Sequence, residues 1–399
     1  MTGRGKLVLL LGAAVYVLAW VLGSKALYPV AAGLVLAVLV TWVWMRLARR
    51  PLRLERRARR HEHYEGEDVE VDLRLELGPG LPAPGAVAVR ERLSRLGERE
   101  TVVRGSGRLL TAKYVLARVP RGRYVLEDAQ AVLEDPFGLE RREATLAAAS
   151  TLLVYPRLVP LERLFSEASA AVPEGSRLLL RRPSGYDLHS VREHQQGESL
   201  RRVHWRSTAK VGRLMVKELE DAPRDEVAVV LDASAAGAKG RAFDVQVRAA
   251  GSILRAHAAR KRRSVLLVNG SSAEAARTSG PEDWRRALDL LAAVEPAGHR
   301  PVEALLAHEG NLVARALELA VVTSVLPPQL VDRLIQRAAT HRHVSLVYVD
   351  TASFAGATPV PQPGLLWLQA AGVPVALVRR GDNLAAVLAA PAAREAVHA

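Results

Sequence analysis

Two long uncharged stretches near the beginning of the chain restrict its folding more than any other feature of the sequence. Residues 7–24 are eighteen uncharged residues, residues 26–45 are twenty, and only Lys25 separates them. About 20 residues, at a rise of 1.5 Å per residue, cross the ~30 Å hydrocarbon core of a bilayer as a helix. Because the link is too short for a domain, the pattern predicts a transmembrane helical hairpin. A cleaved signal peptide, with a cleavage site at Ser24-Lys25-Ala26, is the alternative for the first stretch.

Positive charge is concentrated around these stretches. The chain has a formal net charge of +14, and residues 1–60 contribute +10, from eleven Lys or Arg and one Glu. Arg4 and Lys6 precede the first stretch, and eight arginines at 46–60 follow the second. The positive-inside rule predicts that both ends of the hairpin, and everything after residue 60, are cytoplasmic, at an inner or plasma membrane. The same arginines are compatible with binding of anionic lipid headgroups, at ~1 kcal/mol per basic residue near the surface.

Three further regions follow the basic segment at 1–60. Residues 69–77 alternate apolar and charged side chains, the period of a strand with one buried face. Short apolar runs separated by Gly-rich turns continue the pattern, so residues 61–157 are predicted to form a small antiparallel β-sandwich. Residues 158–225 link this domain to residues 226–399, where strand and helix patterns alternate. That alternation predicts an α/β domain with a doubly wound parallel sheet.

Short apolar runs mark the strands expected in the α/β domain. They lie at 227–231, 265–268, 319–322, 344–349 and 374–378. Asn269-Gly270 follows the second run and predicts a hairpin turn. Asp232 and Ser234 follow the first run, at the end of the strand where α/β domains bind ligands. Since carboxylate and hydroxyl oxygens suit Mg²⁺, these two residues are candidate metal ligands.

Residues 185–220 carry a longer motif. Its pieces are Gly185, Arg192-Glu193, Gly197-Glu198, Leu200-Arg201-Arg202, His204-Trp205, Thr208-Ala209 and Leu214-Met215-Val216. The motif closely resembles the signature of the bacterial domain of unknown function 58 family, and the order of two spans, a β domain and the signature is also similar. The resemblance implies that residues 226–399 are a von Willebrand factor A-like domain. It also implies a membrane-anchored accessory protein whose relatives occur beside MoxR-type AAA ATPases and transglutaminase-like membrane proteins, without a known reaction.

The resemblance bears on the candidate metal site as well. Von Willebrand-type metal sites use Asp-x-Ser-x-Ser, a threonine from a second loop and an aspartate after a later strand. Asp232 and Ser234 match, but the third position is Ala236 and the later strand ends in Thr323-Ser324. The second loop is expected to include Gly298. We therefore expect binding of a partner without a metal, and Mg²⁺-dependent capture of a partner carboxylate is the alternative.

The signature supplies the candidate residues for binding a partner. They are Arg192, Glu193, Gly197, Arg201, Arg202, His204, Trp205 and Arg206. Arginine pairs bidentately with carboxylates, so an acidic protein surface fits this set. The spacing of the histidines in this segment does not match a zinc site. The segment also lacks the interleaved aromatic residues and the recognisable motif expected of a nucleic-acid-binding protein. The chain contains no cysteine, no Gly-x-Ser-x-Gly and no phosphate-binding loop, so we expect an adaptor and not an enzyme.

Trp205 has two competing interpretations. A buried tryptophan between the β and α/β domains would lock them together, because its side chain covers 150–250 Å². An exposed tryptophan would instead be a hot spot for a partner. We expect burial.

Overall fold

The computed structural model of the 399-residue chain describes most of its backbone. The described residues are 1–47, 51–60, 62–79, 86–135, 137–146, 148–168, 187–193, 203–220, 227–270, 273–277, 281–307, 313, 316–340, 343–358 and 360–389. Within these ranges, side chains are described except at 168, 187–192, 217–220, 273–277, 281–282 and 307. Contacts divide the chain into two compact units, Met1–Tyr155 and Pro156–Ala399.

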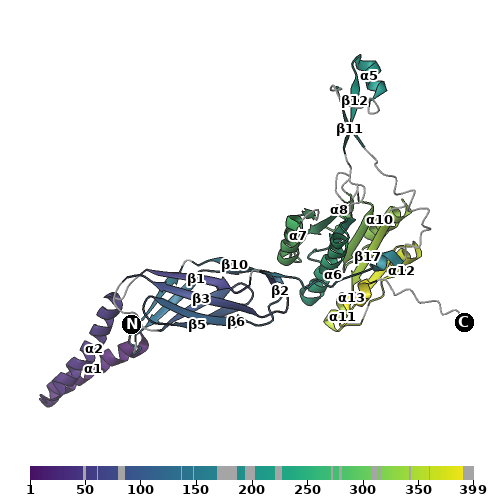
Figure 1. Ribbon diagram of the computed structural model, residues 1–399. Coiled ribbons are helices and arrows are strands. Elements are labelled where there is room, and N and C mark those ends of the chain that lie inside the picture. The colour runs from purple at the N-terminus through teal and green to yellow at the C-terminus, as the bar shows by residue number, and fades with distance from the viewer. Residues whose placement is uncertain are drawn as a thin grey trace. The chain divides into compact units, whose positions relative to one another are not determined.

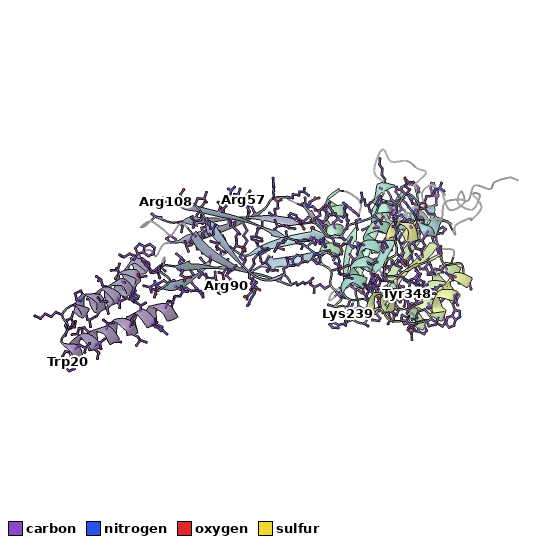
Figure 2. All side chains as sticks on the ribbon, turned by 90° about the horizontal axis from the view of Figure 1, so that it is seen from below. Trp20, Arg57, Arg90, Arg108, Lys239 and Tyr348 are labelled. Carbon is purple, nitrogen blue, oxygen red and sulfur yellow. The ribbon has the colours of Figure 1, made fainter. Side chains whose placement is uncertain are left out.

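The first unit begins with the two apolar helices. Helices α1 (Gly3–Leu22) and α2 (Leu27–Leu47) are long and apolar enough to cross a membrane, and they lie side by side (Figure 1). The rings of Tyr16 and Tyr28 meet edge to face, with centroids 5.5 Å apart. Trp20 lies at the end of the pair that is remote from the following sheet (Figure 2). The expected hairpin of two helices is therefore present, although length and composition alone say nothing of which side of a membrane each end occupies.

The strands of this unit form one curled mixed sheet. They are β1 (Leu52–Ala58), β2 (His63–Tyr64), β3 (Val69–Leu77), β4 (Ala86–Leu93), β5 (Gly97–Arg104), β6 (Leu109–Leu116), β7 (Gly122–Leu126), β8 (Ala129–Glu134), β9 (Arg141–Leu146) and β10 (Ser150–Tyr155). The main order is β1-β3-β6-β5-β4-β7-β10-β2, with β8 and β9 paired onto β4. All pairs are antiparallel except β2 with β10. The small antiparallel sandwich that we expected is thus a single, larger sheet that curls around its own apolar core.

Strand β1 lies in the arginine-rich segment that we expected to be only a juxtamembrane flank. The Arg56 side chain is 4% exposed, and its Nε lies 2.5 Å from Glu91 Oε1 on β4. Arg57 pairs with Glu55, and Arg59 pairs with Glu70. Arg56 is therefore part of the interior of the sheet, whereas the side chains of Arg57 and Arg59 are 64% and 69% exposed.

The second unit contains a parallel sheet with helices on both faces. Its strands are β13 (Val227–Leu231), β14 (Ser264–Asn269), β15 (Ala273–Arg277), β16 (Glu318–Thr323), β17 (His343–Val349) and β18 (Val375–Val378). Its helices are α3 (Phe165–Ala168), α6 (Gly240–Ala259), α7 (Pro281–Ala293), α8 (Val302–Ala307), α10 (Pro328–Ala339), α11 (Thr351–Ala355), α12 (Pro363–Ala370) and α13 (Leu384–Leu388). One core cluster joins the sheet to α6, α7 and α13, and a second joins it to α8, α10 and α12. The five strands predicted from apolar runs are confirmed, and the predicted hairpin at Asn269-Gly270 joins β14 to the antiparallel edge strand β15.

The order of strands places the sheet's ligand-binding point. The order is β15-β14-β13-β16-β17-β18, so the chain builds outward from β13 in both directions. In open parallel sheets, the point where the order reverses leaves a crevice at the carboxyl ends of the strands. Here that point lies between β13 and β16, directly beside Asp232.

Residues between the first unit and the parallel sheet form a separate hairpin. Strands β11 (Asp187–Glu193) and β12 (Met215–Glu220) pair antiparallel with each other in a two-stranded sheet, and α5 (Trp205–Val211) lies at its closed end (Figure 1). We call the described residues 203–216 the hairpin tip.

Candidate functional site

The carboxylate of Asp232 connects the ends of three neighbouring strands. Its side chain follows β13, and the residue is 4% exposed. Asn269, at the end of β14, donates from Nδ2 to Asp232 Oδ1 at 2.9 Å. Thr323, at the end of β16, donates from Oγ1 to Asp232 Oδ2 at 2.6 Å. These three residues, the strand-end cluster, fasten the carboxyl ends of β14, β13 and β16 to one another.

Backbone contacts close the crevice further. The Ser234 N–H donates to Asp232 Oδ1 at 3.0 Å, and Asn269 Oδ1 accepts from the Ala233 N–H. Gly298 packs so tightly here that a Cβ at its position would lie 1.8 Å from the carbonyl oxygen of Asn269. The loop that we expected to bring a threonine ligand therefore brings a glycine backbone.

The strand-end cluster does not fit a resident Mg²⁺ ion. A hard dication needs about six oxygen ligands, and the cluster has only three oxygen-bearing side chains, which bond to one another. Both oxygens of Asp232 already accept hydrogen bonds, and so does the side-chain oxygen of Asn269. In the described parts of the chain, no group of three or more His, Cys, Asp or Glu could hold a metal. Thr323, at the strand end where the resemblance led us to look for an aspartate, donates a hydrogen bond to Asp232.

Sequence reasoning missed Asn269 and assigned Thr323 no role. Asn269 was interpreted only as a turn residue, and Thr323 only as a missing carboxylate. The usable signal was that Asp232, Asn269 and Thr323 each stand at the end of an apolar run, because parallel strands bring such positions to one edge.

The hairpin tip is a second candidate site, and its own side chains build it. His204 caps α5, where Nδ1 lies 2.7 Å from Ser207 Oγ, and its backbone N–H donates to the Met215 carbonyl. Thr208 Oγ1 accepts from the Met215 N–H at 3.0 Å, which ties the helix to β12. Gly212 ends α5 with a φ of +75°, a conformation that favours glycine. His204 is therefore a structural residue of the tip.

Trp205 is exposed, so the prediction that it is buried is wrong. The residue is 66% exposed at the start of α5, whereas Val203 and Val216, which pair with each other, are buried. Arg206 is also exposed. The capping by His204, not packing of Trp205, holds the helix in place.

The other predicted signature residues are only partly described. Glu193 is exposed, and its Oε2 lies 3.7 Å from Arg213 Nη1. Arg192 lies on β11 opposite Val216, but its side chain lies outside the described residues. Gly197, Arg201 and Arg202 also lie outside them. The structure thus brings His204, Trp205 and Arg206 together on the tip.

Further exposed side chains extend the tip beyond the predicted set. Val211 is 55% exposed and Leu214 is 42% exposed. Lys210 and Arg213 are exposed between them. The tip therefore presents apolar side chains interspersed with cations.

Comparison with known families covers both candidate sites. Residues 190–371 match a family model described as protein of unknown function DUF58. The match begins within β11, includes the hairpin tip and the strand-end cluster, and ends just after α12. The resemblance stated from the signature is therefore supported for this part of the chain.

Individual relatives are distant. The uncharacterized protein YeaD of Bacillus subtilis (strain 168) is 26% identical over 125 residues, 31% of this chain and 31% of that protein. The chain thus spans about a third of this relative's length. The CARDB domain of the PF1109 protein from Pyrococcus furiosus is 12% identical over 27% of this chain and 94% of that one, with a TM-score of 0.20. Cwp6 from Clostridium difficile is 10% identical over 81% and 49%, with a TM-score of 0.17. Neither TM-score carries an argument about fold or function.

Proposed function

We propose that this chain is a membrane-anchored adaptor that binds a protein partner through the hairpin tip and has no catalytic activity of its own. The observation that supports this function best is the exposure of Trp205 at the start of α5. Tryptophan and arginine dominate hot spots of protein interfaces, because both combine a large contact area with directional hydrogen bonds. The internal hydrogen bonds of the tip hold α5 in place before a partner arrives, which reduces the entropy lost on binding.

The charge of the tip favours a partner with an acidic surface. Arg206, Lys210 and Arg213 are exposed within residues 203–216, a segment without Asp or Glu, and Arg213 lies near Glu193 of β11. Complementary charge raises the association rate and selects the partner. A MoxR-type AAA ATPase is the partner that the family resemblance suggests, with a transglutaminase-like membrane protein as a further member of the assembly.

The remaining parts of the chain have supporting roles in this proposal. Helices α1 and α2 anchor the protein in the membrane, and the basic residues around them orient both soluble units toward the cytoplasm. The α/β unit is of the von Willebrand factor A type, with the strand-end cluster in place of a metal site. In that unit Asp232, Asn269 and Thr323 stabilise the crevice instead of coordinating Mg²⁺.

A matched pair of tryptophan variants tests the function. Trp367 on α12 is 57% exposed, close to the 66% of Trp205, and it lies in the same unit. In binding measurements between the full chain in nanodiscs and the MoxR-type ATPase of the same organism, Trp205→Ala should weaken the complex about 30-fold, the effect of losing a hot spot of ~2 kcal/mol. Trp367→Ala should bind like the unaltered chain.

Two controls complete the experiment. The melting temperatures of both variants should equal that of the unaltered chain, because neither side chain is buried. Binding should be the same with Mg²⁺ and with a chelator. Equal binding by Trp205→Ala would refute the role of the tip, and binding that needs Mg²⁺ and is lost in Asp232→Asn would establish the metal-dependent alternative.

A further inference from the structure

The turn between β8 and β9 exposes the aromatic side chain of Phe137 to solvent. The Asp135 carboxylate accepts hydrogen bonds from the backbone N–H groups of Phe137, at 2.8 Å, and of Glu140. Gly138 has a φ of +68°, and its N–H donates to the Asp135 carbonyl at 3.0 Å. While Asp135, Gly138 and Leu139 are buried, Phe137 is 75% exposed. Among the described residues of this turn, hydrogen bonds hold the backbone at Phe137 while most of its ring surface is exposed.

This turn is fastened to the first residues of α1. The Thr2 N–H donates to the Leu139 carbonyl at 3.0 Å, and Thr2 Oγ1 donates to the Gly138 carbonyl at 2.6 Å. A Cβ at Gly5 would lie 2.3 Å from the Leu139 oxygen, so helix and turn are in direct backbone contact. The position of Phe137 along the axis of α1 is consequently set by these contacts.

That position is the edge of the apolar stretch. Gly5 precedes the first residue of the stretch, Leu7, by two residues, which is about 3 Å along a helix. Trp42, near the end of α2, stacks against Arg46, with the guanidinium carbon 4.3 Å from the ring centroid. Aromatic and basic side chains together are typical of the membrane–water interface.

Charged side chains line a depression at the same place. Its volume is about 760 Å³, and its lining includes Arg4, Arg141, Glu134 and Glu143 beside Gly138. Arg141 Nη2 lies 3.1 Å from Glu143 Oε1, so the depression presents guanidinium and carboxylate groups side by side. Such a combination matches the phosphate and ammonium groups of a phosphatidylethanolamine headgroup.

We propose that the turn at 135–140 is a membrane-interface contact, in which Phe137 inserts at the boundary of headgroups and acyl chains and the adjacent depression receives phospholipid headgroups. The inference rests on the proposed membrane anchor, because α1 sets the depth of the turn. A phospholipid bilayer is the occupant that this continuity with the span requires. The contact holds the curled sheet at the membrane surface, independently of any partner at the hairpin tip.

The absence of cysteine makes the proposal directly measurable. Single nitroxide labels are placed at Phe137→Cys, at Leu10→Cys in α1 and at Val125→Cys on β7. The full chain is reconstituted in nanodiscs of phosphatidylethanolamine and phosphatidylglycerol. Leu10 and Val125 are 69% and 45% exposed, so both labels fit on the surface of the protein. For each nitroxide label, accessibility to oxygen is divided by accessibility to a water-soluble nickel chelate. This ratio should be highest for the label at position 10, lowest for the label at 125 and intermediate for the label at 137.

Two other outcomes have distinct meanings. If the label at position 137 has the same accessibility ratio as the label at 125, while the label at 10 lies in the hydrocarbon, the interface contact is wrong. The membrane anchor would still hold in that case. A low ratio at 10 overturns the anchor and this inference together. A second variant, Phe137→Trp, retains an aromatic ring at this position. Lipids brominated near the headgroup should quench the fluorescence that the new tryptophan adds. If that added fluorescence is not quenched, the proposal is contradicted.

Discussion

His257 shows at the residue scale how burial alone changes a side chain's chemistry. It lies on α6 and is 0% exposed. Burial lowers its pKa to about 4, although Glu318, whose Oε1 is 3.7 Å from Nε2, acts to raise it, and Arg262 and Arg260 act to lower it further. In the unfolded chain a histidine titrates near 6.5, so between pH 6.5 and 4 the unfolded state binds more protons than the folded state. Stability that is complete above pH 6.5 is therefore lost as the pH falls toward 4.

We predict that the loss reaches about 3 kcal/mol by pH 4, of which about 2 kcal/mol falls between pH 7 and pH 5, since each unit of pKa shift corresponds to ~1.4 kcal/mol. Thermal melts of the full chain in detergent at pH 7 and pH 5 measure it. His257→Gln should show a smaller drop between the two pH values than the unaltered chain. His343→Gln, which alters an exposed histidine, should keep the full drop, and identical slopes for all three proteins would show that His257 is not responsible.

At the scale of elements, β1 shows that a basic segment can be part of a sheet. Removing one partner of a buried ion pair leaves an uncompensated charge and costs about 3–5 kcal/mol. We predict a cost of this size for Arg56→Met, since the side chains of Arg56 and Glu91 are 4% and 0% exposed. Arg57→Met should cost less than about 1 kcal/mol, because that side chain is 64% exposed.

Denaturant unfolding of the full chain, monitored by circular dichroism, compares the two variants. Each variant removes one positive charge from β1, so an effect of net charge or of membrane orientation on stability would be the same in both. A difference between the variants therefore reports on the buried ion pair. If Arg56→Met and Arg57→Met have equal free energies of unfolding, the buried ion pair does not stabilise the sheet more than the exposed pair does.

At the scale of the whole molecule, the orientation of both units depends on the two apolar helices. Basic residues flank the outer ends of the helices, whereas the link between them carries only Lys25. We predict that a fluorescent protein fused to Ala399 folds in the cytoplasm and that alkaline phosphatase fused there is inactive. Alkaline phosphatase fused after Lys25 should be active, and activity at Ala399 instead would place the hairpin tip away from any cytoplasmic ATPase.

The sequence by itself determined the features that depend on short-range patterns. The uncharged stretches predicted α1 and α2, the apolar runs predicted the strands of the parallel sheet, and Asn269-Gly270 predicted the hairpin of β14 and β15. These predictions succeeded because helix length, apolar continuity and turn chemistry are each properties of consecutive residues.

Only the tertiary structure decided where individual polar and aromatic side chains lie. Asp232 and Thr323 are 91 positions apart, and Arg56 and Glu91 are 35 apart, yet each pair is in hydrogen-bond contact. Trp205 is 66% exposed although it begins the capped helix α5, and Thr2 fastens the turn that carries Phe137 to the start of α1. Such pairings depend on which distant strands become neighbours. The local pattern of residues marks where strands end but does not specify their order in the sheet.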